Sequence, residues 1–186
     1  MLNSEILTIR VSVFMAISLD GFIARPDGDV SWLDEYEPMG EGEDGGYGDI
    51  FQAVDVMVMG RGSFEKVLEF NDWPYGSKPI IVLSRSLTEF PKELQGSVRI
   101  DNSAPEELLE KLAQKGHKHI YLDGGQVVRS FLRQGLVDDL TLTVIPVLLG
   151  DGIPLFGKLE KELQLDLLES RSWKNGFAQL KYQIIK

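Results

Sequence analysis

The sequence predicts a three-layer α/β domain, in which a mixed, mostly parallel sheet has helices on both faces. Two observations predict this fold. Short apolar runs alternate with amphipathic segments over most of the chain, and strands separated by helices imply right-handed crossovers and parallel pairing. Two later runs are joined by Asn175-Gly176, a strong hairpin signal. We therefore expect a parallel sheet that ends in an antiparallel hairpin.

Length and composition indicate a single globular domain over residues 1–186, because 43% of the residues are hydrophobic and 26% are charged. A net charge of -10 disfavours nucleic acid and anionic lipid as partners. The chain has no cysteine and two histidines, so we expect no metal site. No apolar stretch is long enough for a membrane helix, and the first residues do not resemble a signal peptide. The expected location is the cytoplasm.

The first strand is predicted from Ile9 to Ile17, where apolar side chains alternate and the second face is not uniformly polar, as in a central strand. Arg25 to Asp29 has the composition of a turn. The acidic, glycine-rich segment from Trp32 to Asp49 is long for a loop, which indicates a functional or mobile segment. A short helix is expected from Asp49 to Val54.

Two units of strand, glycine turn and helix follow. In one, the strand Val56–Met59 leads to Gly60-Arg61-Gly62-Ser63, with Ser63 as the expected N-cap. In the other, the strand His119–Leu122 leads to Gly124-Gly125 and a helix with the apolar face Val127, Val128, Phe131 and Leu132. Unpaired N–H groups at such helix starts suit a phosphate.

The remaining elements complete the sheet. The apolar run Pro79–Leu83 ends at Ser84-Arg85-Ser86, and a helix from Pro105 to Lys115 is expected to be capped by Ser103. Asp138 to Leu149 is predicted to be a strand. The runs Leu163–Ser172 and Phe177–Ile184 should form the C-terminal hairpin.

Three polar tips fall at the carboxyl ends of predicted parallel strands, where ligands bind in open α/β sheets. They are the loops at Arg61, Arg85 and Gly125. If they converge on one cleft, two helix N-termini and two arginines make a site for a ligand with several phosphates, and a dinucleotide fits best. The three-glycine fingerprint of the classical Rossmann site is missing.

Five segments also carry a family resemblance. They occur in the order seen in the dihydrofolate reductase fold: Met15 to Ala24, Met59 to Glu65, Ile81 to Arg85, Asp123 to Gly125, and Leu142 to Pro146. The chain most resembles the reductase domain of bacterial bifunctional riboflavin-biosynthesis deaminase/reductases and their stand-alone relatives. No His/Cys zinc signature of the deaminase domain is present.

The resemblance implies an NADPH-dependent reductase and assigns residues to each part of the cofactor. Ala16 and Ile23 would border the nicotinamide, and Ser84 and Arg85 would hold the 2′-phosphate. The remaining phosphate contacts would come from Gly60, Arg61, Gly62, Ser63, Gly124, Gly125, Gln126 and Val127. The Gly124-Gly125 peptide would be cis.

On the substrate side the resemblance implies Asp20 in a mobile loop, and Trp32 and Thr143 beside the substrate. The proton donor stays open among the acids that follow Trp32, namely Asp34, Glu35 and Glu37. The substrate would be a small heterocycle such as 5-amino-6-(5-phosphoribosylamino)uracil. The alternatives are a true dihydrofolate reductase and a nucleotide-binding protein without turnover. A homodimer is expected through the run from Thr141 to Leu149 and the apolar loop Ile153 to Phe156.

Overall fold

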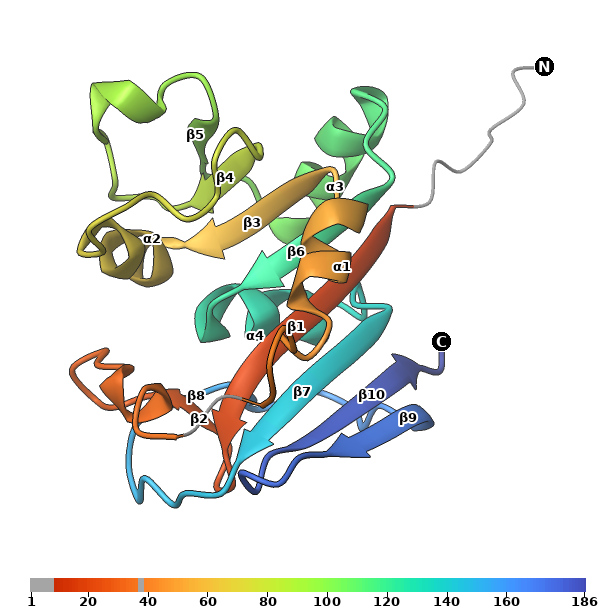
Figure 1. Cartoon of the computed structure of the whole chain (residues 1–186). Helices are drawn as coiled ribbons and strands as arrows, with labels where there is room; N and C mark the ends of the chain where they lie inside the picture. The colour runs from red at the N-terminus through yellow and green to blue at the C-terminus, as the bar shows by residue number, and fades with distance from the viewer. Residues whose placement is uncertain (1–8, 37–38) are drawn as a thin grey trace.

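The computed structural model describes residues 9–36 and 39–186, which form an eight-stranded sheet, a two-stranded sheet and the helices around them (Figure 1). The strands are β1 (Arg10–Ser18), β2 (Phe22–Ala24), β3 (Val56–Gly60), β4 (Ile80–Leu83), β5 (Val98–Asp101), β6 (His119–Asp123), β7 (Asp139–Ile145), β8 (Ile153–Pro154), β9 (Leu165–Ser172) and β10 (Ala178–Ile184). The helices are α1 (Tyr47–Ala53), α2 (Arg61–Leu68), α3 (Pro105–Gln114) and α4 (Gly125–Arg133), with 3-10 turns η1 (Ser31–Leu33) and η2 (Lys92–Leu94).

The large sheet has the order β5-β4-β3-β6-β1-β7-β10-β9. Strands β5 to β7 in this order pair in parallel, whereas β10 is antiparallel to both β7 and β9. The predicted mixed sheet, its central first strand and its C-terminal hairpin are therefore confirmed.

Helices pack on both faces, and alternate residues of β3 show how the sequence divides them. Val56 and Val58 join the core cluster that holds the apolar residues of α3 and α4. Met57 and Met59 join the cluster with Phe64 of α2 and side chains of α1. Successive side chains of a strand point to opposite faces, so α1 and α2 cover one face, and α3 and α4 the other.

Two predicted helix caps are wrong. Gly60 is the N-cap of α2, and Ser63 lies in the first turn, where its hydroxyl hydrogen-bonds the Asp123 carboxylate instead. Ala104 precedes α3, while the Ser103 hydroxyl donates to Asp101 and accepts from Lys111 Nζ at 2.6 Å. In both cases the serine hydroxyl is hydrogen-bonded to another side chain instead of to the backbone of the helix.

The surface expected to make a dimer is only partly exposed, with Leu148 at 68% and Phe156 at 42% exposure, and the homodimer stays a prediction. β7 lies between β1 and β10, so Thr141, Leu142, Thr143 and Ile145 are buried, and Leu155 is fully enclosed. No helix in the described part of the chain is long and apolar enough to cross a membrane.

Candidate functional site

A cleft of about 720 Å³ lies at the carboxyl ends of β3, β4 and β6. Six of the residues predicted to bind phosphates or the 2′-phosphate line it: Gly60, Arg61, Ser84, Arg85, Gln126 and Val127. The three loops picked out by sequence therefore meet at one place, as the pairing of their parallel strands requires.

Two further arginines line the cleft, Arg129 and Arg133 of α4. Sequence reasoning missed them, although they are one helical turn apart on the helix that begins at Gly125. Four arginines thus gather in one cleft of a chain with a net charge of -10. The local charge favours an anionic ligand against the overall field of the protein.

Hydrogen bonds of Ser84 and Ser86 fix the loop that follows β4. The Ser84 hydroxyl accepts hydrogen bonds from the backbone N–H groups of Ser86 at 3.2 Å and Leu87 at 3.0 Å. Arg61 Nη1 donates to Ser86 Oγ at 3.1 Å, which joins this tip to the start of α2. Arg85 stays exposed at the mouth of the cleft.

The Gly124-Gly125 turn differs from its prediction, because no peptide bond in residues 9–36 or 39–186 is cis. The chain turns at Gly124 with a φ of 88° and a ψ of 136°, a conformation that essentially only glycine adopts. A Cβ on Gly125 would lie 2.6 Å from Arg129 Nη1 and 2.7 Å from the Pro154 carbonyl oxygen. Glycine is therefore required at Gly124 by the backbone conformation and at Gly125 by packing.

Arg129 bridges α4 and β8. Its guanidinium donates to the Pro154 carbonyl, and its side chain packs against Gly157. Burial, followed by the charge of Arg133, lowers the pKa of Arg129. The start of α4 is thereby held against the small sheet of β2 and β8, where Ile23 lies close to Gly125.

The predicted substrate residues lie on the face covered by α1 and α2. Ala16 is the sheet partner of Thr143 and packs in a cluster with Trp32, which is 1% exposed. The Trp32 indole N–H is buried without a hydrogen-bond partner among the described residues. Thr143 Oγ1 accepts from Gln179 Nε2 at 3.0 Å, and the same nitrogen donates to the Gly45 carbonyl at 2.9 Å.

Asp123 lies on this same face, at the end of β6. It is two residues after Tyr121, which packs in the cluster of α1 and α2. Burial raises the pKa of the Asp123 carboxyl, while hydrogen bonds from Ser63 and from the Gly124 N–H oppose the increase. Burial, and then the charge of Asp123, raise the pKa values of Tyr47, Tyr75 and Tyr121. Sequence reasoning treated Asp123 only as part of a turn.

The acids that follow Trp32 have a different setting. Asp34 is exposed after η1, and Glu35 pairs with Arg25 at 3.7 Å. Glu37 lies outside the described residues. Asp20 accepts from the N–H groups of Leu149 at 3.1 Å and Gly150 at 2.8 Å, so it ties the turn after β1 to the loop after β7.

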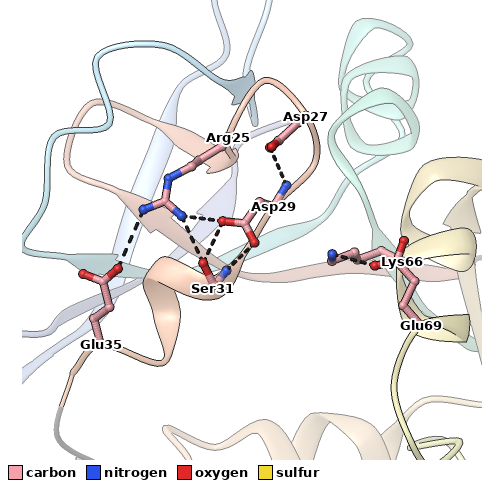
Figure 2. Close-up of polar contacts among 7 residues, drawn as sticks. All are labelled: Arg25, Asp27, Asp29, Ser31, Glu35, Lys66 and Glu69. Carbon is pink, nitrogen blue, oxygen red and sulfur yellow. Dashed lines mark hydrogen bonds and ion pairs between the residues drawn. The ribbon is translucent and has the colours of Figure 1, made fainter.

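The loop from Arg25 to Glu35 is held by a polar network (Figure 2). The Arg25 guanidinium contacts Asp29, Ser31 and Glu35, and hydrogen bonds from Ser31 and Arg25 lower the pKa of Asp29 to about 2. Figure 2 shows Lys66 of α2 facing this loop while bonded to Glu69, 2.7 Å away. The loop and α2 thus present opposite charges to each other.

Sheet order, helices on both faces and a ligand-sized cleft at the strand ends place the molecule in the class of α/β proteins with the dihydrofolate reductase fold. The structure superposes on dihydrofolate reductase from Enterococcus faecalis, in complex with NADP(H), with a TM-score of 0.67 and 16% identity, over 95% of this chain and 97% of that one. At this identity the likeness concerns the fold alone.

The chain belongs to the family of the RibD C-terminal domain, whose sequence model matches residues 10–178. It is 37% identical to the uncharacterized protein YwjB of Bacillus subtilis (strain 168), over 93% of this chain and 97% of that protein. A putative riboflavin biosynthesis protein from Shewanella sp. PV-4 superposes with a TM-score of 0.90 and 36% identity, over 96% of this chain and 100% of that one.

Proposed function

We propose that the protein is an NADPH-dependent reductase that acts on a small heterocycle, with 5-amino-6-(5-phosphoribosylamino)uracil as the first substrate to test. The observation that carries the proposal is the single cleft lined by Arg61, Arg85, Gln126 and Val127. Membership of a family named for the RibD C-terminal domain supports reductase chemistry.

The cleft fits the anionic half of NADPH, which carries a pyrophosphate and a 2′-phosphate. Its volume of about 720 Å³ lies in the range of cofactor sites. No atom of residues 9–36 or 39–186 lies within 4 Å of the Cβ position of Gly62, so the exposed start of α2 is open to a phosphate. Arg61 would bind the pyrophosphate there, and Ser84 and Arg85 would bind the 2′-phosphate. When bound, NADPH supplies the hydride.

The residues around the substrate position would orient it and deliver a proton. Ala16 and Thr143 form the floor, because they are neighbours on adjacent strands. Trp32 offers an indole N–H that has no hydrogen-bond partner among the described residues. Reduction of a C=N or C=O bond also needs a proton. We assign the role of proton donor to Asp123. Burial raises the pKa of this carboxyl, and the side chain lies on the same face of the sheet as Ala16 and Thr143.

The proposal is tested by titrating the protein with NADPH and NADH, followed by an assay of NADPH oxidation with pyrimidine and pteridine substrates. We expect tighter binding of NADPH and turnover with a pyrimidine. Turnover with dihydrofolate alone would favour a folate reductase. Binding of NADPH without turnover of any heterocycle would favour a nucleotide-binding protein, and the absence of binding would reject the cofactor site.

A further inference from the structure

Almost all of the net charge of the chain lies in one segment. The acidic segment, residues 20–49, carries ten aspartates and glutamates and one base, Arg25. Its net charge is -9, against -10 for the whole chain, so the rest of the protein is close to neutral. The Arg25 guanidinium is already engaged by Asp29 and Glu35 (Figure 2). An anion that approaches this segment therefore meets a strongly negative field.

The acidic segment borders the proposed substrate position. Trp32 of this segment packs with Ala16 in one apolar cluster. The carbonyl of Gly45, also in the segment, accepts a hydrogen bond from Gln179, which donates to Thr143 as well. The segment is thus attached to both residues that form the floor of the substrate position. Its negative charge therefore acts on the substrate as well as on solvent.

One carboxylate is fixed next to this attachment. Asp44 precedes Gly45 and accepts hydrogen bonds from the N–H groups of Gly48 at 2.7 Å and Gly46 at 2.8 Å. These two bonds lower the pKa of the Asp44 carboxyl, so that it stays charged at neutral pH. A fixed negative charge disfavours a second anion nearby.

The cofactor cleft shows how this chain provides for phosphate. In the described part of the chain, four arginines and no acid line the cleft. The face of the sheet that carries Thr143 also carries two bases on the next strands, Lys181 of β10 and Arg171 of β9. Arg171 is ion-paired with Glu169, which is also the sheet partner of Lys181. Glu169 therefore offsets part of the charge of these two bases, in contrast with the acid-free lining of the cleft.

We propose that the heterocycle reduced by this protein carries no phosphate, and that the acidic segment excludes phosphorylated analogues. A phosphate monoester has a charge of about -1.5 to -2 at pH 7, which the field of this segment opposes. The groups at the substrate position suit a neutral planar ring instead. They are the Trp32 indole N–H, the Thr143 hydroxyl and the rings of Phe14 and Tyr47, whose centroids are 6.0 Å apart. This inference rests on the proposed reductase function and narrows its substrate.

The test compares 5-amino-6-(5-phosphoribosylamino)uracil with 5-amino-6-ribosylaminouracil, the same molecule without its phosphate, at saturating NADPH. We expect kcat/KM to be at least about tenfold higher for the unphosphorylated form, because like charges repel the other one. Raising NaCl from about 20 to about 300 mM should increase kcat/KM for the phosphorylated form alone, since salt screens exposed charges. An equal or higher kcat/KM for the phosphorylated form overturns the inference and leaves the reductase function standing. Turnover of neither form also overturns it, and lack of turnover with every pyrimidine and pteridine rejects the function as well.

A charge reversal separates the acidic segment from other causes of a preference. Glu41→Lys changes an exposed side chain of the segment and should raise kcat/KM for the phosphorylated form by about threefold or more, with little effect on the unphosphorylated one. Glu110→Lys, exposed on α3 at the opposite face of the sheet, is the matched control. The Kd for NADPH of each variant shows whether the cofactor site has changed. Equal responses of the two substrates to Glu41→Lys overturn the inference, as does a preference for the phosphorylated form that Lys181→Ala abolishes.

Discussion

The hydroxyl of Ser63, in the first turn of α2, occupies the space that a Cβ on Gly124 would need. The two glycine turns that the sequence indicates separately are therefore one unit in space. Gly60 completes it, since its N–H lies 3.8 Å from the same Cβ position. The starts of α2 and α4 have their relative position fixed by this contact, and both border the arginine-lined cleft.

Replacing Gly124 with alanine should destabilise the protein. Its φ of 88° costs a residue with a side chain roughly 1–3 kcal/mol, and the new methyl group would overlap Ser63. We expect a fall of that size or more in the free energy of unfolding, measured with urea. Gly96→Ala is the control, because no atom in the described part of the chain lies within 4 Å of its Cβ position and its φ is not positive. Adding Ser63→Ala should recover part of the loss, and no recovery would show that the contact is unimportant.

Arg85→Ala should weaken NADPH and spare NADH. A charge-assisted hydrogen bond contributes roughly 1.5–3 kcal/mol, which corresponds to about a ten- to hundredfold higher Kd for NADPH. Fluorescence titration with both cofactors measures the two constants. Lys115→Ala, which removes an exposed cation outside the cleft, is the matched control. Equal losses for both cofactors would remove Arg85 from the 2′-phosphate role.

Asp123→Asn should lower kcat strongly, by about a hundredfold for a lost general acid, with a smaller effect on NADPH binding. Burial raises the pKa of Asp123, so the protonated donor persists above the usual pH for aspartate and is lost as the pH rises through that pKa. In a pH profile, the wild-type kcat should therefore fall as the pH rises through the pKa of Asp123, and the kcat of Asp123→Asn should not show this decrease. Asp34→Asn is the companion variant. If Asp34→Asn lowered kcat and Asp123→Asn did not, the proton donor would be in the loop after Trp32 instead.

Gln179→Ala should loosen the loop that covers the substrate face. Its amide nitrogen joins Thr143 to the Gly45 carbonyl, and removing a buried partner leaves two acceptors unsatisfied, at about 1–3 kcal/mol. We expect lower stability and faster amide exchange around Gly45. Gln183→Ala, an exposed glutamine on the same strand, is the control. Unchanged exchange at Gly45 would contradict the contact.

Sequence alone was sufficient where one local signal determines the structure. Val56 to Met59 form a compact apolar run, and Arg61 and Arg85 follow directly after apolar strands, so the mostly parallel sheet and the cleft could be predicted. β5 was missed because Arg99 and Asp101 interrupt its apolar pattern, and its backbone pairing with β4 makes it a strand.

Other features depend on contacts between segments that are distant in sequence. The local sequence predicts Ser63 as a helix cap, and only the folded chain shows that its hydroxyl hydrogen-bonds Asp123. Asp123 likewise resembles a turn residue in the sequence, and only the fold shows that its charge acts on Tyr47 and Tyr75. The buried position of β7 follows from pairing with both β1 and β10, which no periodicity within Asp139–Ile145 reveals.

His119 should make the stability of the protein depend on pH near neutrality. Burial, and then the charge of Arg10, lower the pKa of His119 below its ordinary value of 6.5, although Asp139 opposes them. The unfolded chain therefore takes up a proton at a higher pH than the folded protein does. The free energy of unfolding should then be greatest above pH 6.5 and should fall as the pH drops through 6.5 toward the lower folded pKa.

The measurement is urea unfolding at a series of pH values between about 5.5 and 7.5, the range in which histidine titrates. His119→Gln should flatten the slope, and His117→Gln is the matched control for the loss of a histidine. His119 belongs to a polar cluster that joins β6, β1 and β7. Its Nε2 lies 2.8 Å from Ser12 Oγ, and Ser12 in turn donates to Asp139 at 3.0 Å. These contacts determine how strongly the stability depends on pH. Equal slopes in the two variants would mean that this cluster does not distinguish the charge states of His119, and the pH dependence would then belong to the carboxylates.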